Sequence, residues 1–483
     1  MIPTMVPNVR LHFLDRLRVL AFALLILYHV GMLYVSWGYH IKSPRLVPGI
    51  EWLMVTVNPW RLALLFFISG VASQFLGDKL GAAAFARDRL RRLLPVLVFG
   101  ILVVVPPQSY LELRQDGKVA QGYFDFWLGH YLRGDQSFGI ALPTWNHLWF
   151  LPYLIVYSVV FATVTWAATW ITTRSTTRGT TRSTTPSLRR LAPRLPTLAL
   201  MLAPALWMAL ANVLAQERWP ETRALVGDWA GHLRWAGLFA FGVLAAKQDD
   251  FWELLRRRVG TIAAVTTATL GLFLGIRSAI HAGVIGSAFD GTAYAVGEGL
   301  YGWPAILCLM AVAARWWNHP SPSLRYLTVA ILPVYALHQT LIIVTAWMLF
   351  PLGWPLPAEA AAIIAVTALG SLAIYELAIR RIPLLGVLFG LRVAPKTRRL
   401  ANPRISTPDC DPPASVDQAL AAGHSDAEVD VATIGAVRRP TAALSGQQAH
   451  LPVNPAGCDR RSAASVSPSA ETAARPTRDG RTW

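Results

Sequence analysis

Residues 17–37 read LRVLAFALLILYHVGMLYVSW, an apolar run that decides the class of fold. A helix needs about 20 residues to cross the roughly 30 Å hydrocarbon core of a bilayer, and this run is long enough. Arg10, Arg16 and Arg18 lie before or at the start of the run, as basic residues do in a signal peptide. The run is too long for the apolar part of a signal peptide and lacks a small-residue cleavage site, so we expect a retained membrane anchor.

Nine more apolar runs follow, so the sequence predicts an all-α, polytopic membrane protein with about ten transmembrane helices. The ten predicted spans lie near residues 17–37, 52–76, 91–109, 147–171, 196–215, 229–246, 259–276, 294–314, 326–349 and 359–381. The third run is the weakest, because Pro95 and Pro106–Pro107 bracket a short apolar stretch. Loops on one side of these runs carry 17 Lys and Arg residues, against 8 on the other side. Cytoplasmic loops are enriched in Lys and Arg, so we expect both termini in the cytoplasm.

Composition supports a membrane protein and argues against other classes. Hydrophobic residues make up 54% of the 483 residues and charged residues only 15%, whereas soluble proteins carry about 25% charged residues. The net charge of +17 is explained by basic loops on one side of a membrane, so we expect no nucleic-acid partner. Cys308, Cys410 and Cys458 are too few and too scattered for a disulfide scaffold or a zinc site, and we predict no metal.

Two segments have low-complexity sequences outside the predicted bundle. Residues 172–187 read TTRSTTRGTTRSTTPS, which predicts that 172–196 form a flexible cytoplasmic loop. Residues 393–483 are rich in Ala, Pro, Ser, Thr, Arg and Asp, with no helix or strand period, which predicts a disordered cytoplasmic tail. We therefore divide the chain into a transmembrane domain over 1–392 and a tail over 393–483.

Arg18 and His29 in the first span form the clearest candidate site. They are 11 residues apart, or about three helical turns, so they share one face and lie roughly 16 Å apart along the axis. A titratable side chain near mid-membrane is costly, and histidine is best suited to proton transfer near neutral pH. His29 is therefore a candidate catalytic residue. The alternative is a structural histidine that is hydrogen-bonded to a neighbouring helix.

Arg89 and Arg92 form a second candidate site at the start of the third span. Their spacing places both on one helix face. Two guanidinium groups there can bind a phosphate through paired hydrogen bonds. The alternative is ordinary anchoring by basic residues on the cytoplasmic side of a span.

Six further residues are candidates for substrate binding or supporting roles: Asp15, Arg61, Ser69, His147, Tyr335 and His338. Ser69 lies in the motif FFISG at 66–70, in which small residues favour close helix packing. Arg61 is interpreted as a snorkelling residue at the membrane interface, with binding of an anionic substrate as the alternative. His338 is as compatible with a structural hydrogen bond as with a function. His147 opens the fourth span, where it either lines a site or belongs to an aromatic belt.

Together these residues resemble the integral-membrane acyltransferase-3 family. Its signature is an Arg, ten residues and a His in the first helix, followed by an Arg-x-x-Arg pair. Arg18 and His29 match the first part of this signature, and Arg89 and Arg92 match the second. The FFISG motif and a later YALHQ motif, which contains Tyr335 and His338, also resemble family patterns.

The likeness extends across residues 10–390, in the order of the motifs and in the ten-helix layout. The stretches YHVGM at 28–32 and VPPQSY at 105–110 are similar to the branch of glucan-biosynthesis protein C, which adds succinyl groups to periplasmic glucans. One departure is that His147-Leu148-Trp149 is followed by no acidic residue, whereas many family members have one in the fourth helix.

The resemblance implies a membrane-bound O-acyltransferase in the bacterial cell membrane. Such an enzyme moves an acetyl or succinyl group from cytoplasmic acyl-coenzyme A to a hydroxyl of an extracytoplasmic glucan or other glycan. Acyl-coenzyme A is then a co-substrate, and no permanently bound cofactor is implied. Arg89 and Arg92 would bind the coenzyme phosphates. Arg18 would anchor the coenzyme or tune His29, which would act as general base or as acyl carrier.

The same mechanism needs two further groups. A hydrogen-bond donor must stabilise the thioester oxyanion, for which His338 and Tyr335 are the candidates. For succinyl transfer, the second carboxylate of the acyl group needs a cation, and Arg61 is the candidate.

A different class of protein fits part of the same pattern. Ten helices with His29 and His338 inside them also suit a transporter that uses these histidines as a proton relay. Many transporters contain inverted repeats, and the two halves of this sequence show no repeat. Consumption of acyl-coenzyme A distinguishes the two classes, since only the enzyme requires it.

Overall fold

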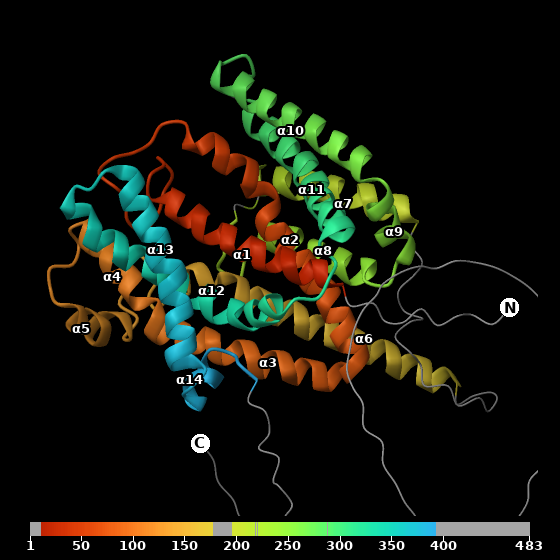
Figure 1. Ribbon diagram of the computed structural model, residues 1–483, viewed down its shortest axis with the longest axis horizontal. Helices are drawn as coiled ribbons and strands as arrows, with labels where there is room; N and C mark the ends of the chain where they lie inside the picture. The colour runs from red at the N-terminus through yellow and green to blue at the C-terminus, as the bar shows by residue number, and fades with distance from the viewer. Residues whose placement is uncertain (1–10, 177–195, 218, 220, 287, 393–483) are drawn as a thin grey trace, which may run out of the picture. The chain divides into compact units, whose positions relative to one another are not determined.

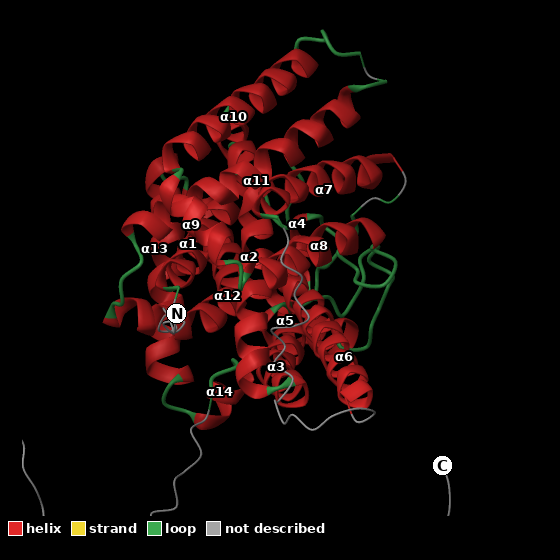
Figure 2. Ribbon diagram, turned by 90° about the vertical axis from the view of Figure 1, so that its right-hand side faces the viewer, coloured by secondary structure: helices red, strands yellow, loops and turns green. Residues whose placement is uncertain are grey.

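The structure is a computed structural model that describes residues 11–176, 196–217, 219, 221–286 and 288–392 (Figure 1). These described residues form helices and loops with no β-strand (Figure 2), which confirms the all-α prediction. The predicted flexible loop falls mainly on residues outside the described ranges, and the predicted disordered tail lies entirely outside them.

Eight helical segments of the described chain are long and apolar enough to cross a membrane. They are α2 (Ile50–Leu80), the continuous segment of α3 (Ala82–Phe99), η1 (Gly100–Val104) and α4 (Pro106–Gln115), the segment of η3 (Asn146–Trp149) and α6 (Phe150–Thr176), α7 (Thr197–Glu217), α10 (Val259–His281), α11 (Asp290–Trp316), α12 (Pro322–Leu349) with η5 (Phe350–Leu352), and α13 (Leu356–Ile374) with η6 (Tyr375–Ile379). Shorter helices connect or follow them: α5 (Tyr123–Phe126), η2 (Trp127–Tyr131), α9 (Asp249–Arg257) and α14 (Pro383–Leu388).

Helices also cover the first and sixth predicted spans, as α1 (His12–Met32) and α8 (Trp229–Ala245). Three charged residues lie in the first two turns of α1, and α8 has 17 residues, a length of about 26 Å. Neither helix is among the eight candidate spans. The polytopic membrane fold is confirmed, whereas the count of ten and the cytoplasmic termini stay predictions.

The first helix has a central position in the bundle (Figure 1), where it contacts α2, α11, α12 and α13. This position follows from its sequence, because apolar residues on different sides of the helix, such as Phe13, Leu25 and Ile26, are all buried. By contrast, α10 lies at the edge of the bundle in both views (Figures 1 and 2), and only its Phe273 is buried. The central position of α1 places His29 among several helices.

The third predicted span proves to be one continuous helical segment of 34 residues. Pro95 lies inside α3, and Pro106 lies in the first turn of α4, where the missing N–H has no helical partner to lose. Between them, η1 has π-helical geometry. Pro106 is therefore accommodated at a helix start, whereas Pro95 lies within α3, in the last turns before a local change of helix type.

The change of helix type in η1 leaves main-chain carbonyls available for side chains. Three of them accept from a side chain of another segment: Ile101 O from Tyr131 Oη at 2.9 Å, Leu102 O from Trp127 Nε1 at 2.9 Å, and Val104 O from Thr340 Oγ1 at 2.7 Å. Non-ideal backbone within a membrane is tolerated only when its polar groups find such partners. Side chains from the loop after α4 and from helix α12 thus supply the hydrogen bonds that the main chain of the third span needs.

Two glycines bring α2 and α8 into close contact. A Cβ atom added to Gly70 would lie 2.0 Å from Phe239 O, and one added to Gly242 would lie 2.1 Å from Phe67 O. Each glycine therefore lies directly against the backbone of the other helix. This contact agrees with the interpretation of the FFISG motif as a site of close helix packing.

We expect Gly70→Ala to destabilise the protein by about 1–3 kcal/mol or more, because the added methyl group would overlap a main-chain carbonyl that cannot move alone. Gly271→Ala is the matched control, since a Cβ at Gly271 would meet nothing within 4 Å and alanine favours a helix. Thermal unfolding in detergent measures both variants. Equal unfolding temperatures for the two would contradict the assigned contact.

Candidate active site

Three histidines that are far apart in the sequence meet inside the bundle. His29 of α1 and His338 of α12 are joined by a 3.0 Å contact between Nδ1 and Nε2. The ring centroid of His147, from η3, lies 5.1 Å from that of His338. We call these three residues the histidine cluster. The sequence identified each as a separate candidate, and the fold brings them together.

The hydrogen bonds of His338 define which nitrogens of the cluster carry protons. His338 Nδ1 lies 2.6 Å from the carbonyl oxygen of Tyr335, which can only accept, so Nδ1 must donate. In neutral His338, Nε2 is then an acceptor, and His29 Nδ1 must donate to it. It follows that Nε2 of neutral His29 carries a lone pair. This is the state that a general base or a nucleophile requires.

His147 has a supporting position in the cluster. It is 7% exposed, its Nε2 donates to Ala336 O at 3.1 Å, and its Nδ1 accepts from Gln108 Nε2 at 3.3 Å. The Tyr335 hydroxyl donates to the main-chain carbonyl of His147 at 2.5 Å. Both ring nitrogens of His147 are thus used within the protein, which fits a role in holding His338 in place.

Gln108 of α4 links the cluster to its surroundings. It is fully buried, and its Nε2 also lies 2.7 Å from Thr340 Oγ1. Its Oε1 accepts from Gln339 Nε2 at 3.0 Å and from Asn146 Nδ2 at 3.2 Å. The sequence analysis did not single out Gln108, although an amide side chain within an apolar span was a signal that could have identified it.

The loop at 33–49, which joins α1 to α2, covers His29. The ring of Tyr39 stacks on the His29 ring, with centroids 6.0 Å apart and planes 14° apart. The Tyr39 hydroxyl is buried and has no hydrogen-bond partner among the described residues. The next residue, His40, contacts Glu112 of α4 at 2.5 Å between Nδ1 and Oε2, so the loop is attached to the helix on the other side of the site.

Lys42 fixes the same loop to the end of α1. Its Nζ donates to the carbonyl oxygens of Met32 at 2.6 Å and Trp37 at 2.9 Å, and to that of Val35. Burial lowers the pKa of the Lys42 amino group from its ordinary value. The main chain of Lys42 also exchanges two hydrogen bonds with the Gln115 side chain, at 2.8 and 3.0 Å. These contacts hold Tyr39 in a defined position against His29.

Arg61 of α2 lies inside the protein near the histidine cluster. It is 5% exposed, so its interpretation as a snorkelling residue is wrong. Its Cζ lies 3.4 Å from the ring centroid of Tyr28, and Nη2 donates to Asn58 Oδ1 at 3.4 Å. Nε and Nη1 are buried with no partner among the described residues. The positive charge acts on both His29 and His338.

Arg61 therefore offers a binding site for an anion. Within the described residues, no carboxylate forms an ion pair with its guanidinium. A buried charge without a counter-ion is costly, whereas a bound anion would both neutralise it and satisfy the two unpartnered nitrogens. The alternative that the sequence left open, an anion-binding role, agrees with this geometry.

Four arginines form a second group toward the start of α1. Arg18, Arg92 and Arg392 lie close enough to Arg89 for their charges to act on it, and we call these four residues the arginine cluster. Arg89 Nη2 donates to Ser73 Oγ at 3.2 Å. The Nε atoms of Arg89 and Arg92 are buried with no partner among the described residues. Arg392 was not identified from the sequence, because it joins the others only through the fold.

The acidic residues near this cluster do not balance its charge. Asp15 lies 3.8 Å from Arg18, one turn away in α1, and Asp88 binds Arg392 at 2.9 Å. The cluster retains surplus positive charge and unpartnered N–H groups, which suits a ligand with several phosphates. Arg18 belongs to this cluster and lies roughly 16 Å along α1 from His29. Its position favours binding of an anionic ligand over tuning of the imidazole.

Ser69 lies in α2 beside Gly70, at the contact with α8.

No cluster of three or more His, Cys, Asp or Glu residues able to hold a metal ion occurs among the described residues.

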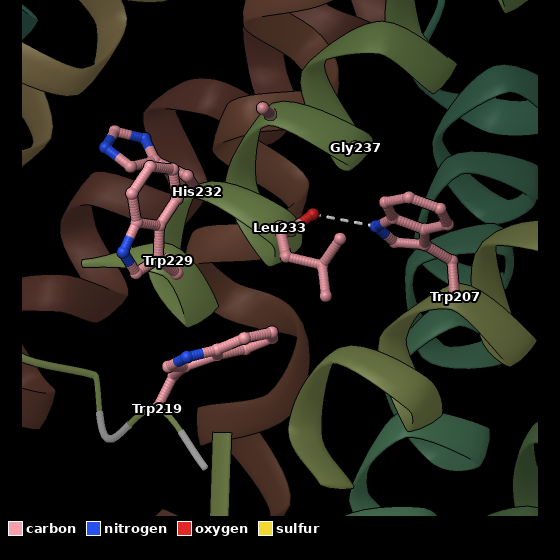
Figure 3. Close-up of a pocket in the computed structure, with 7 residues that line it drawn as sticks. Trp207, Trp219, Trp229, His232, Leu233 and Gly237 are labelled. Atoms are coloured by element: carbon pink, nitrogen blue, oxygen red, sulfur yellow. Dashed lines mark hydrogen bonds between the residues drawn. The ribbon is translucent and has the colours of Figure 1, made fainter. Parts of the chain in front are cut away.

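A separate open cavity of about 470 Å³ lies beside α7 and α8 (Figure 3). Its wall consists of Trp207, Trp219, Trp229, His232, Leu233, Ala236 and Gly237. Trp207 Nε1 donates to Leu233 O at 2.8 Å, and the two nitrogens of His232 contact Leu225 O at 2.6 Å and Tyr157 Oη at 3.0 Å. The polar side-chain atoms of Trp207 and His232 are therefore used within the protein.

Comparison with known proteins agrees with this chemistry. The model of the acyltransferase-3 family, an acyltransferase domain, matches residues 11–376. The chain is similar to proteins named Glucans biosynthesis protein C from Escherichia coli. It is 28% identical to that of strain SMS-3-5 over 155 residues and 27% identical to that of strain K12 over 152 residues. Each alignment covers 31% of this chain and 38% of the relative. No solved structure matches the chain.

Proposed function

Because the chain belongs to the acyltransferase-3 family and is a membrane O-acyltransferase, we propose that it moves an acyl group from acyl-coenzyme A to a hydroxyl of a glucan or other glycan across the bacterial cell membrane. The observation that carries this proposal is the arrangement along α1. A cluster of four arginines lies toward one end of the helix, and a histidine with a free Nε2 lies toward the other.

The arginine cluster is the proposed binding site of the coenzyme. The phosphates of coenzyme A are anions that match the surplus positive charge, and guanidinium groups bind phosphate through paired N–H donors. Arg89 and Arg92 each have a buried nitrogen available for this purpose. From there, the pantetheine arm would carry the thioester along α1 toward His29.

His29 is the proposed reacting residue. As general base, its Nε2 takes the proton of the acceptor hydroxyl while the oxygen attacks the thioester carbonyl. As nucleophile, the same lone pair attacks the carbonyl, and the acyl group passes to the acceptor in a second step. The hydrogen bond to His338 supports both routes, because it orients the ring and stabilises the positive charge that His29 acquires.

Arg61 is the proposed site for the second carboxylate of a succinyl group. Its buried position near His29 and its two unpartnered nitrogens support this role. An acetyl group has no such carboxylate, so the two donors should respond differently when Arg61 is changed.

For Arg61→Gln we expect kcat/KM for succinyl transfer to fall by about 10–100-fold, since a charged hydrogen bond to the carboxylate is lost. Acetyl transfer should fall far less. The matched control is Arg277→Gln, which also removes a guanidinium that lies over an aromatic ring, that of Trp52 at 4.8 Å. Initial rates with both donors measure the difference. Equal losses for succinyl and acetyl transfer would contradict the assignment.

The activity itself is tested with membranes that contain the protein and a verified glycan acceptor. Succinyl- or acetyl-coenzyme A labelled in the acyl group is supplied on the cytoplasmic side, and the glycan fraction is examined for label. Label that requires the protein supports acyl transfer. Absence of label with either donor would contradict the proposal and favour a transporter.

A further inference from the structure

Acyl transfer from a thioester creates a negative charge that needs a hydrogen-bond donor. When a nucleophile adds to the carbonyl carbon, an electron pair moves onto the carbonyl oxygen, and donors at about 2.7–3.1 Å stabilise this oxyanion. The two groups that the sequence offers for this role are already engaged. Tyr335 Oη donates to His147 O, and His338 donates through Nδ1 and accepts through Nε2.

Tyr39 has the free donor that these residues lack. Its hydroxyl is buried without a partner among the described residues, which is costly for a polar group. Its ring lies parallel to that of His29, with centroids 6.0 Å apart. The phenol that carries this donor therefore lies beside the imidazole whose Nε2 is the proposed reacting atom.

We propose that the Tyr39 hydroxyl donates a hydrogen bond to the thioester oxyanion during acyl transfer. This inference rests on the proposed function and adds a catalytic residue to it. The loop that carries Tyr39 is held by the His40–Glu112 contact and by Lys42, so the donor is positioned before the substrate arrives. Such preorganisation is what makes oxyanion stabilisation effective.

The step is balanced without any further reactant. The acceptor oxygen bonds to the carbonyl carbon while His29 Nε2 takes the hydroxyl proton, and the carbonyl electron pair moves to the oxygen beside Tyr39. The carbonyl then re-forms, the C–S bond breaks, and protonated His29 returns its proton to the coenzyme sulfur. The products are an ester and free coenzyme A. Tyr39 keeps its proton throughout, in accord with burial, which raises the pKa of its phenol above the ordinary value.

The test is Tyr39→Phe, which keeps the stacked ring and removes only the hydroxyl. We expect kcat to fall by about 10²–10³-fold with acetyl- and succinyl-coenzyme A alike. KM for acyl-coenzyme A should be nearly unchanged. The unfolding temperature should stay the same or rise, because the change removes a buried hydroxyl that has no partner.

Tyr34→Phe is the matched control from the same loop. The Tyr34 hydroxyl donates to buried Glu359 at 3.0 Å, so this variant should unfold at a lower temperature and keep its kcat. Wild-type kcat in Tyr39→Phe would overturn the proposal, as would a loss of kcat accompanied by a fall in stability like that of Tyr34→Phe. If Arg61→Gln loses acetyl transfer and succinyl transfer equally while Tyr39→Phe stays active, Arg61 and not Tyr39 would be the group that stabilises the oxyanion.

These outcomes are distinct from failure of the proposed function. If the wild type transfers label and His29→Ala does not, a fully active Tyr39→Phe contradicts the role of Tyr39 alone. If the wild type transfers no label, the proposed function fails first.

Discussion

His29→Ala is expected to lower kcat for acyl transfer by about 10²–10⁴-fold, the range that a positioned acid–base group contributes. The physical reason is the free Nε2, which no other member of the histidine cluster provides, since His147 and His338 use both of their nitrogens within the protein. The measurement is transfer of labelled acyl groups to the glycan fraction by membranes with matched protein levels.

The control for this prediction is His281→Ala, which removes an exposed histidine at the end of α10 and should leave transfer unchanged. If His29→Ala membranes transfer label as the wild type does, the enzyme assignment stands and His29 is not the reacting residue.

Incubation with labelled acyl donor and no acceptor separates the two roles of His29. Label that is bound to the wild-type protein and absent from His29→Ala indicates an acyl carrier, and its absence from both indicates a general base.

Arg89→Ala is expected to raise KM for acyl-coenzyme A by about 10–100-fold, because charged hydrogen bonds to a phosphate are lost. A smaller effect on kcat should accompany it, since the arginine cluster lies far along α1 from His29 and binds the donor before and during the reaction. Initial rates over a range of donor concentrations measure both constants.

Arg91→Ala is the matched control, because Arg91 belongs to the same basic run and is exposed. Ordinary membrane anchoring predicts similar small effects for Arg89 and Arg91, and that result would argue against phosphate binding. A change in KM confined to Arg89, which is partly buried, would support the coenzyme site.

Several parts of the site were predictable from short-range pattern. The spacing of Arg18 and His29, and that of Arg89 and Arg92, place each pair on one face of a helix because each residue advances a helix by a constant rise and rotation. The small residues of FFISG likewise indicate close packing, and Gly70 lies against α8.

Other parts were missed because they depend on neighbours from distant segments. Arg61 has the sequence context of an interface residue, yet α1 covers it with Tyr28 and it is buried. The third span is weak by composition, yet side chains from the following loop and from α12 satisfy its π-helical carbonyls. Tyr39 lies in a loop, where no periodic pattern reports burial.

The sequence by itself determined that this chain is an all-α membrane protein and which single residues merit attention as candidates. Hydropathy and helix geometry suffice for these points because both act over about 20 residues. Only the tertiary structure decided which nitrogen of His29 is free, that Arg61 is buried, and that Arg392 joins the arginine cluster. Those properties arise from contacts between separate segments of the chain, such as that between His29 and His338, which are 309 positions apart, and no local pattern encodes them.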